Sequence, residues 1–274
     1  MIAATDRPWN SATTLYIARK IQAFAAERSA PLKVLNMGCG GAITTQALHP
    51  DGYDQYGYDI ALNKSVVYPV VSKLYPDDYQ ERFIQSVDER TIPFADNTFD
   101  VIFANQVFEH VRFMDRMFEE CARVLRPEGM LIALFPFASV PIEFHLKIPF
   151  AHWIPPGQAR VNYLRPFYAL GLRPKEAGKN SYESAVYWEQ YMRDFTYYRL
   201  KNEVVMLMEY YFERWEDDTA AYIEARRDLC DVNPTLKLKL LKAFLEHFPH
   251  KPLLYYLVGN YFGATLAMRC PRKK

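Results

Sequence analysis

Cysteine is scarce in this sequence. The 274 residues include four cysteines, which are widely scattered: Cys39, Cys121, Cys230 and Cys270. They form no Cys-x-x-Cys pair and no Cys/His spacing of the kind that binds zinc, and they do not suggest a disulfide framework. We therefore expect reduced thiols and a cytoplasmic protein.

Long hydrophobic runs are also missing. The longest apolar stretch near the end, PLLYYLVGNYFGATLAM, is shorter than the roughly 20 residues that a membrane-spanning helix needs, and Gly259, Asn260 and Gly263 interrupt it. The first ten residues, MIAATDRPWN, lack the basic and then apolar pattern of a secretion signal. These features predict a soluble protein with no integral membrane segment.

Neither sign of charge is in excess. Lysine and arginine number 33 against 32 for aspartate and glutamate, which leaves a formal net charge of +1. A protein that binds nucleic acid generally presents a basic excess to the phosphates. The balance therefore argues against RNA or DNA as a partner, and the basic end, PRKK, is interpreted as a short solvated tail.

Strand and helix patterns alternate from residue 32 to residue 137. Short apolar runs at 32–37, 53–60, 81–88, 99–106 and 130–137 predict five strands, and the stretches between them, such as 113–125, predict helices. Repeated strand–helix alternation is typical of an open, doubly wound, mostly parallel sheet. We predict an α/β fold of this kind, with seven strands in the sheet.

The second half of the sequence is less regular. A helix with a proline interruption is expected at 157–172, a sixth strand is suggested at 172–178, and 263–270 reads as the last strand. Leucine and aromatic residues at helical spacing from Leu200 to Trp215 predict a helix through that stretch. We expect residues 1–180 to form the core with an N-terminal helix, 181–250 a helical insertion that acts as a substrate lid, and 251–274 the final strand.

The expected strands place polar groups where they end. Asn36–Gly41, Asp59, Asp88 and Asn105–His110 each follow a strand directly. In a parallel sheet with right-handed crossovers, the carboxyl ends of the strands meet at one edge, where ligands bind. We therefore predict a binding site at this edge.

The first of these segments is a glycine-rich turn, VLNMGCGGA. A phosphate-binding P-loop would need a lysine after the glycines, and the sequence GGAITT has none. A dinucleotide fingerprint would need a glycine where Ile43 stands. The turn is better suited to a cofactor without phosphates that lies against bare backbone.

Four stretches in order resemble one known family. VLNMGCGGA, YGYDI, SVDERTIPFADNTFDVIFANQVFEHV and RVLRPEGMLIALFP are similar to the class I S-adenosylmethionine-dependent methyltransferases, in particular to their small-molecule branch. The resemblance covers roughly residues 30–140. It implies S-adenosyl-L-methionine as the cofactor and methyl transfer as the activity.

The resemblance also implies roles for the residues at the sheet edge. Asp59 would accept hydrogen bonds from both ribose hydroxyls, since a carboxylate offers two acceptor oxygens, and Asp88 with Glu89 would hold the adenine. The interpretation of the two aspartates as helix N-caps stays open. The remaining implied cofactor contacts are Asn36, Gly38, Cys39, Gly40, Gly41, Ile60, Asn105, Gln106 and His110.

Two positions depart from the family pattern. Asn36 stands where an acidic residue is usual, and Ala42 replaces a glycine that is often found in this turn. A neutral hydrogen bond in place of a charged one weakens binding by roughly 1 kcal/mol. We expect a functional site with somewhat lower cofactor affinity.

The acceptor side of the site is expected in the proline-rich segment PFASVPIEFHLKIPFAHWIPP, which follows the fifth strand. His145 and His152 are the two candidate general bases for a hydroxyl nucleophile. No carboxylate–carboxylate–asparagine set like that of metal-dependent catechol-type enzymes is evident, so no metal is predicted. Further on, the helical block is rich in aromatic side chains that stack well on sugars or flat rings: Tyr187, Trp188, Tyr191, Tyr197, Tyr198, Tyr210, Tyr211 and Trp215.

These features favour O-methylation of a small hydroxylated acceptor, such as a sugar or a specialised metabolite. N- or C-methylation is an alternative that would depend less on a base. A non-catalytic subunit that uses the same fold for interaction is another, which Asn36 and the aromatic block leave open. A nicotinamide enzyme is disfavoured by Ile43. A homodimer is left open.

Overall fold

The structure is a computed structural model that describes residues 11–28, 30–86, 88–232, 236–261 and 263–272. Three parts of the sequence discussed above lie outside the described residues. They are the segment considered for a secretion signal, Val87 in the third expected strand, and the last two residues of the basic tail. Among the described helices, none combines the length and the apolar composition that crossing a bilayer requires.

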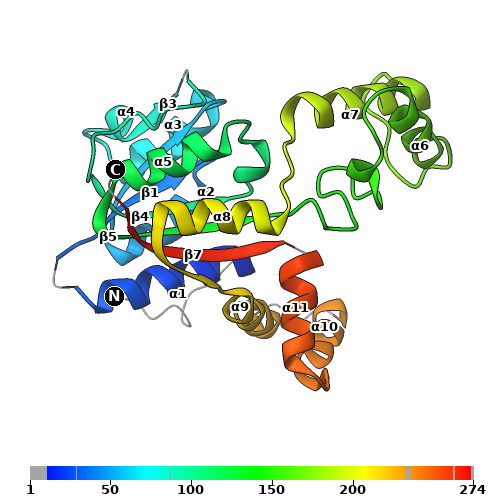
Figure 1. Ribbon diagram of the computed structural model, residues 1–274. Helices are drawn as coiled ribbons and strands as arrows, with labels where there is room; N and C mark the ends of the chain where they lie inside the picture. The colour runs from blue at the N-terminus through cyan, green and yellow to red at the C-terminus, as the bar shows by residue number, and fades with distance from the viewer. Residues whose placement is uncertain (1–10, 29, 87, 233–235, 262, 273–274) are drawn as a thin grey trace.

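A seven-stranded sheet forms the centre of the protein, with the strand order β3-β2-β1-β4-β5-β7-β6 (Figure 1). The first five strands pair in parallel, and β7 runs antiparallel to both β5 and β6. This confirms the predicted seven-stranded, mostly parallel sheet. The strands are β1 (Lys33–Met37), β2 (Asp54–Asp59), β3 (Phe83–Gln85), β4 (Phe99–Asn105), β5 (Leu125–Phe135), β6 (Phe212–Asp217) and β7 (Ala264–Pro271).

Helices cover both faces of the sheet. The α-helices are α1 (Ala12–Ala26), α2 (Ile43–Leu48), α3 (Lys64–Leu74), α4 (Tyr79–Arg82), α5 (Met114–Val124), α6 (Gln158–Ala169), α7 (Ser181–Phe195), α8 (Lys201–Tyr211), α9 (Thr219–Val232), α10 (Leu236–His247) and α11 (Lys251–Tyr261). The short 3-10 helices are η2 (His49–Asp51), η3 (Phe108–His110) and η4 (Ala151–Trp153). In Figure 1, α5 and α8 lie on one side of the sheet, and α1 and α9 lie on the other.

The central strands are apolar because both of their faces are buried. In β4, Val101 and Phe103 pack in the cluster that contains α1 and α9, whereas Ile102 and Ala104 pack in the cluster that contains α5 and α8. Successive side chains of a strand point to opposite faces, so a strand covered on both sides reads as a continuous hydrophobic run. This is why FDVIFANQ predicted its strand correctly.

Two groups of helices extend beyond the carboxyl ends of β4 and β5. One group, α6 and α7, has a small hydrophobic core of its own with the loop residues 146–151. It projects from the rest of the molecule in Figure 1, while α10 and α11 stack near α9 on the other side. The loops that carry the candidate site therefore lie between two helical groups.

The sixth strand is not where the sequence suggested. Residues 172–178 form no strand, and β6 is Phe212–Asp217. The predicted helix through Trp215 ends at Tyr211, because the next residues pair with β7, with Trp215 opposite Met268. The stretch 181–250 is therefore not helical throughout, since it contains a strand of the central sheet. The division of the chain into three parts stays a prediction.

Candidate functional site

The glycine-rich turn joins β1 to α2 and lies against the end of β2. Gly38 and Gly40 have φ angles of 65° and 48°, in the left-handed region that favours glycine. The amides of Gly38 and Cys39 donate to the Tyr58 carbonyl at 2.9 and 3.1 Å, which fixes the turn on the neighbouring strand. A Cβ atom at Gly40 would meet open space, so bare backbone faces the outside there and a ligand can approach it closely.

Asp59, at the end of β2, is oriented by this turn. Its Oδ2 accepts a hydrogen bond from the Gly40 amide at 3.0 Å, and its Oδ1 accepts one from the Ala61 amide at 2.9 Å. A carboxylate oxygen can accept two hydrogen bonds. Each oxygen of this half-buried carboxylate therefore keeps one acceptor position for a ligand, which fits a pair of neighbouring hydroxyls such as those of a ribose.

Asp88 follows β3, which pairs with β2. Asp59 stands opposite Gln85 in the register, and its carbonyl accepts from the Ser86 amide at 3.1 Å. A surface cleft of about 520 Å³ opens at this point. It is lined by Ile60, Gln85, Ser86, Asp88, Glu89 and Arg90.

The Asp88 carboxylate is also used within its own turn. Its Oδ1 accepts from the Arg90 amide and its Oδ2 from the Thr91 hydroxyl, both at 2.9 Å. These hydrogen bonds lower the pKa of Asp88, the one from the Arg90 amide most strongly. The residue therefore stays ionised and shapes the loop, and it keeps free acceptor positions toward the cleft.

Asn36 and Cys39 do not present polar side-chain atoms to the opening of the turn. The Asn36 side chain is buried, and its Nδ2 donates to the Thr45 hydroxyl of α2 at 3.0 Å. The Cys39 thiol is buried, and burial, together with the charge of Asp59, raises its pKa to about 12. Asn36 thus links β1 to α2, and Cys39 offers its backbone to a ligand.

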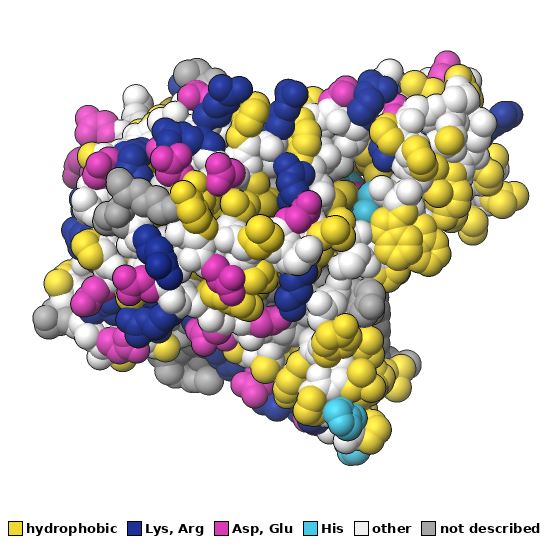
Figure 2. All heavy atoms as spheres, in the orientation of Figure 1, with side chains coloured by type: hydrophobic (Ala, Val, Ile, Leu, Met, Phe, Trp, Pro, Cys, Tyr) yellow, Lys and Arg dark blue, Asp and Glu magenta, His cyan; other side chains and the backbone are white. Residues whose placement is uncertain are grey.

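Asn105 and Gln106, at the end of β4, line an apolar cavity of about 460 Å³. Gln106 has a φ angle of 56°, and its amide donates to the Leu134 carbonyl at 2.7 Å. The opposite wall comes from α9, α10, the residue that follows α10, and α11: Tyr222, Ile223, Arg226, Phe244, Leu245, Phe248, Leu254, Leu257 and Val258. Figure 2 shows hydrophobic side chains gathered over α10–α11 and over α6–α7, with a hollow between the two groups.

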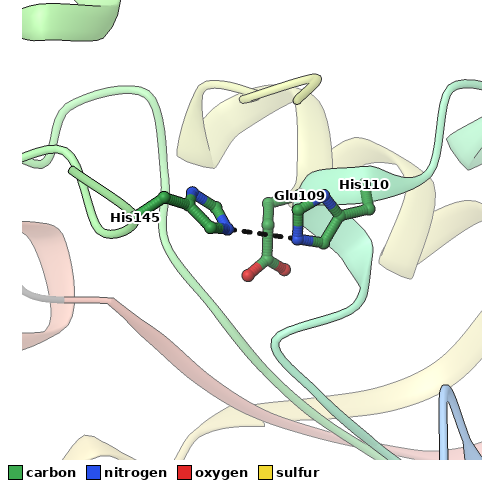
Figure 3. A group of neighbouring side chains, drawn as sticks. All are labelled: Glu109, His110 and His145. Atoms are coloured by element: carbon green, nitrogen blue, oxygen red, sulfur yellow. Dashed lines mark hydrogen bonds between the residues drawn. The ribbon is translucent and has the colours of Figure 1, made fainter. Parts of the chain in front are cut away.

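Three polar side chains meet close in the chain to Gln106 and Phe144, two residues that line this cavity: Glu109, His110 and His145 (Figure 3). Their possible ligand atoms all lie within 4.8 Å of one another. His110 Nε2 and His145 Nε2 are 3.2 Å apart. His110 also lies close enough to Asp59 for the carboxylate to raise its pKa, although burial has the larger, opposite effect and lowers it overall.

Among the residues that the structure describes, Glu109 has no hydrogen-bond partner outside its own residue for either carboxylate oxygen, although the residue is 1% exposed. Burial raises the pKa of this carboxyl to about 8. A buried acceptor without a partner is costly, so its presence here calls for a ligand or a proton.

The side chain of Glu143 orients His145. Glu143 Oε1 lies 2.8 Å from His145 Nδ1 and accepts from the Tyr198 hydroxyl at 2.5 Å, and its Oε2 accepts from the Leu146 amide at 2.6 Å. Burial on its own would raise the pKa of Glu143, but the hydrogen bonds from His145, Leu146 and Tyr198 lower it overall. The carboxylate is therefore ionised and holds the Nδ1 proton of His145.

His152, the second candidate base, lies apart from the three-residue cluster. Its Nε2 lies 3.1 Å from the Ala138 carbonyl, and its buried Nδ1 has no hydrogen-bond partner within the described ranges. It lines a different cavity, of about 290 Å³, with Trp153 and Tyr198. Because Nδ1 is inaccessible and burial lowers the pKa of the ring, His152 is poorly placed to accept a proton from an acceptor molecule.

Two acidic residues of the site were not predicted from the sequence: Glu109, and Glu143, which orients His145. The aromatic residues, which were expected to act as one group, lie in different places. The Tyr191 ring lies 5.4 Å from the His145 ring and 6.5 Å from that of His110. Tyr211, by contrast, is buried against the sheet and donates to Asp115. The sequence feature that could have identified Glu109 as a site residue is its place directly before a histidine in FEHV.

Residues 35–133 match a family model that is described as a methyltransferase domain. A ubiquinone biosynthesis O-methyltransferase from Bradyrhizobium diazoefficiens is 26% identical over 145 residues, which cover 48% of this chain and 51% of that protein. The human mitochondrial ubiquinone biosynthesis O-methyltransferase is 30% identical over 131 residues, 45% of this chain and 33% of that protein. The chain thus spans about half or less of the length of these relatives.

Solved structures also resemble this one at low sequence identity. The YcgJ protein from a Bacillus species is 14% identical, with a TM-score of 0.48 over 94% of this chain and all of that one. A geranyl diphosphate C-methyltransferase from Streptomyces coelicolor A3(2) is 15% identical, with a TM-score of 0.47 over all of this chain and 90% of that one.

Proposed function

Because the chain belongs, through its residues 35–133, to the class I S-adenosylmethionine-dependent methyltransferases, we propose that it transfers the methyl group of S-adenosyl-L-methionine to a hydroxyl oxygen of a small acceptor with an apolar body. The observation that carries this proposal is the apolar cavity that begins at Asn105 and Gln106. These residues lie at the carboxyl end of β4, beside the glycine-rich turn that follows β1. The relatives named O-methyltransferases support oxygen as the receiving atom.

The residues at the sheet edge fit the cofactor. The open backbone at Gly40 accommodates its amino acid part, the two free acceptor positions of Asp59 suit the ribose hydroxyls, and the cleft beside Asp88 suits a flat base. When bound, the cofactor supplies an activated methyl group on a sulfonium. The protein's task is to align the acceptor with the S–CH₃ bond at about 3–3.5 Å and to exclude water.

The acceptor oxygen attacks the methyl carbon as the carbon–sulfur bond breaks, and the hydroxyl loses its proton. The groups able to promote that loss are Glu109, His110 and His145, which follow the cavity residues Gln106 and Phe144 closely in the chain. The acceptor's apolar part would lie against α9, α10 and α11. An apolar lining is a poor match for a sugar, so a hydroxylated aromatic or alkyl metabolite is the better candidate.

Filling the cavity should affect the acceptor and spare the cofactor. Ile223→Trp adds bulk at a buried position of the cavity lining, and we expect it to raise the KM for an alkyl-substituted phenol at least tenfold while S-adenosylhomocysteine binds as in the wild type. Leu170→Trp, at an exposed position, is the matched control and should leave both unchanged. Radiolabelled methyl transfer to a panel of phenols measures the effect, and an unchanged KM in Ile223→Trp would place the acceptor elsewhere.

The two histidines named from the sequence should differ in effect. His145→Ala removes a member of the cluster, and we expect kcat to fall by about 10²–10⁴-fold, which is typical for loss of acid–base assistance. His152→Ala should lower kcat far less, because its Nδ1 is enclosed. Methyl transfer by each variant between pH 6 and 9 tests this. Full turnover by His145→Ala would favour an acceptor atom that needs no deprotonation, as in C-methylation.

A further inference from the structure

The cluster of Glu109, His110 and His145 differs from an ordinary polar contact in how its hydrogen bonds are arranged. His110 Nδ1 lies 2.6 Å from the Phe195 carbonyl, which can only accept, so Nδ1 carries the proton. His145 Nδ1 faces the ionised Glu143 at 2.8 Å, and it therefore carries a proton too. In neutral histidine only one ring nitrogen is protonated, so both Nε2 atoms present lone pairs.

These two lone pairs face each other, and such a pair repels unless something positive lies between them. The Nε2–Nε2 distance is 3.2 Å. Two nitrogens bound at about 2.0–2.1 Å to one ion lie about 2.8–3.4 Å apart when the angle between them is from a right angle to tetrahedral. The observed spacing is that of two ligands of a single metal ion, and equally that of one proton shared by the two rings, one of which would then be cationic.

Glu109 completes a third corner. Its carboxylate lies beside the histidine pair in Figure 3, and all three possible ligand atoms are within 4.8 Å of one another. The residue is 1% exposed, and in the described part of the chain neither oxygen has a partner outside its own residue. This buried carboxyl requires a ligand or a proton, and a cation beside the histidine pair would supply the ligand; it is an observation independent of the histidine spacing.

We propose that Glu109, His110 and His145 bind one divalent transition-metal cation, of which Zn²⁺ is the representative. Imidazole nitrogens with one carboxylate suit zinc, iron or cobalt better than Mg²⁺ or Ca²⁺, which prefer all-oxygen sites. Carboxylate and carbonyl acceptors on the second nitrogen of each histidine are the usual outer contacts of metal-bound histidine, and Glu143 and the Phe195 carbonyl provide them here.

The proposed ion deepens the proposed function, on which its chemical role rests. A cation held by three protein ligands keeps an open position, where an acceptor hydroxyl can bind and lose its proton at neutral pH. The full ligand set could not be predicted from the sequence, because the carboxylate–carboxylate–asparagine pattern is absent and His145 is 35 residues from His110.

Metal binding by the full chain, without a histidine tag, tests the inference independently of activity. Protein stripped with a chelator is titrated with ZnCl₂ and with CoCl₂ by calorimetry, and Co²⁺ absorption bands report nitrogen and oxygen coordination. We expect one ion per chain. His145→Ala and Glu109→Gln should each lower the affinity at least 100-fold, while MgCl₂ should bind at least 100-fold more weakly than ZnCl₂.

His247→Ala is the matched control, because His247 is an exposed histidine on α10 and tests for adventitious surface binding. S-adenosylhomocysteine titration of every variant confirms that the fold and the cofactor site are intact. Loss of affinity in His247→Ala but not in His145→Ala, or no tight binding at all, overturns the metal site. Metal binding as expected without methyl transfer to any phenol would leave the site standing and contradict the proposed function.

Discussion

Asp59→Ala should weaken the binding of S-adenosylhomocysteine at least tenfold, which corresponds to about 1.4 kcal/mol. The carboxylate has one hydrogen bond from Gly40 and one from Ala61, and its remaining acceptor positions face the place where the ribose is expected. Alanine removes the two bonds to the ligand and also the side chain that holds the turn in place. Isothermal calorimetry of the two proteins at the same pH measures the difference.

Two further variants separate these contributions. Asp59→Asn keeps an acceptor for one hydroxyl and is expected to bind with an affinity between those of wild type and Asp59→Ala. Asp51→Ala, which removes an acid from the end of η2, should bind the cofactor normally. If Asp59→Ala bound as tightly as wild type, the ribose would have to lie elsewhere and the placement of the cofactor would be wrong.

The parts of the fold predicted well from the sequence are those whose residues are buried on two sides. β1 and β4 are short apolar runs bounded by turn residues, and both were located to within a residue or two. β6 was missed because it is a strand at the sheet edge in which only Phe212 is fully buried. Its spacing of apolar residues matched a helix, and its partner β7 comes about 50 residues later, where no local pattern can reveal the pairing.

The candidate site also has a part that could be predicted from the sequence and a part that could not. The glycine turn and Asp59 follow strand ends directly, so the sheet geometry alone brings them together. The cluster of Glu109, His110 and His145 depends on the path of the loop after β5 and on the segment after α7, where the Tyr197 amide donates to the Glu109 carbonyl at 2.6 Å. No spacing in the sequence encodes that path, which is why His145 was predicted as an isolated base.

Gly38→Ala should lower the free energy of unfolding by about 2–5 kcal/mol. The φ angle of 65° costs a residue with a side chain roughly 1–2 kcal/mol, and the added Cβ would lie 2.4 Å from Val107 Cγ2, an overlap that typically costs about 1–3 kcal/mol more. Val107 lies directly after Gln106, so relief of the overlap would also shift the strand end at which the acceptor cavity begins. Urea denaturation followed by circular dichroism measures the loss.

Gly40→Ala separates strain from overlap, because its φ of 48° is similar but a Cβ there would meet open space. It should lower the free energy of unfolding only by the backbone strain, roughly 1–2 kcal/mol. It should also reduce the affinity for the cofactor, because the new methyl group lies where the cofactor approaches the backbone. Combining Gly38→Ala with Val107→Ala should be less damaging than the sum of the two single changes, by about 1 kcal/mol or more. If the losses in the free energy of unfolding were strictly additive, the two residues would not be in contact. The glycine at position 38 would then be needed for a reason other than the close approach of Val107, which follows β4.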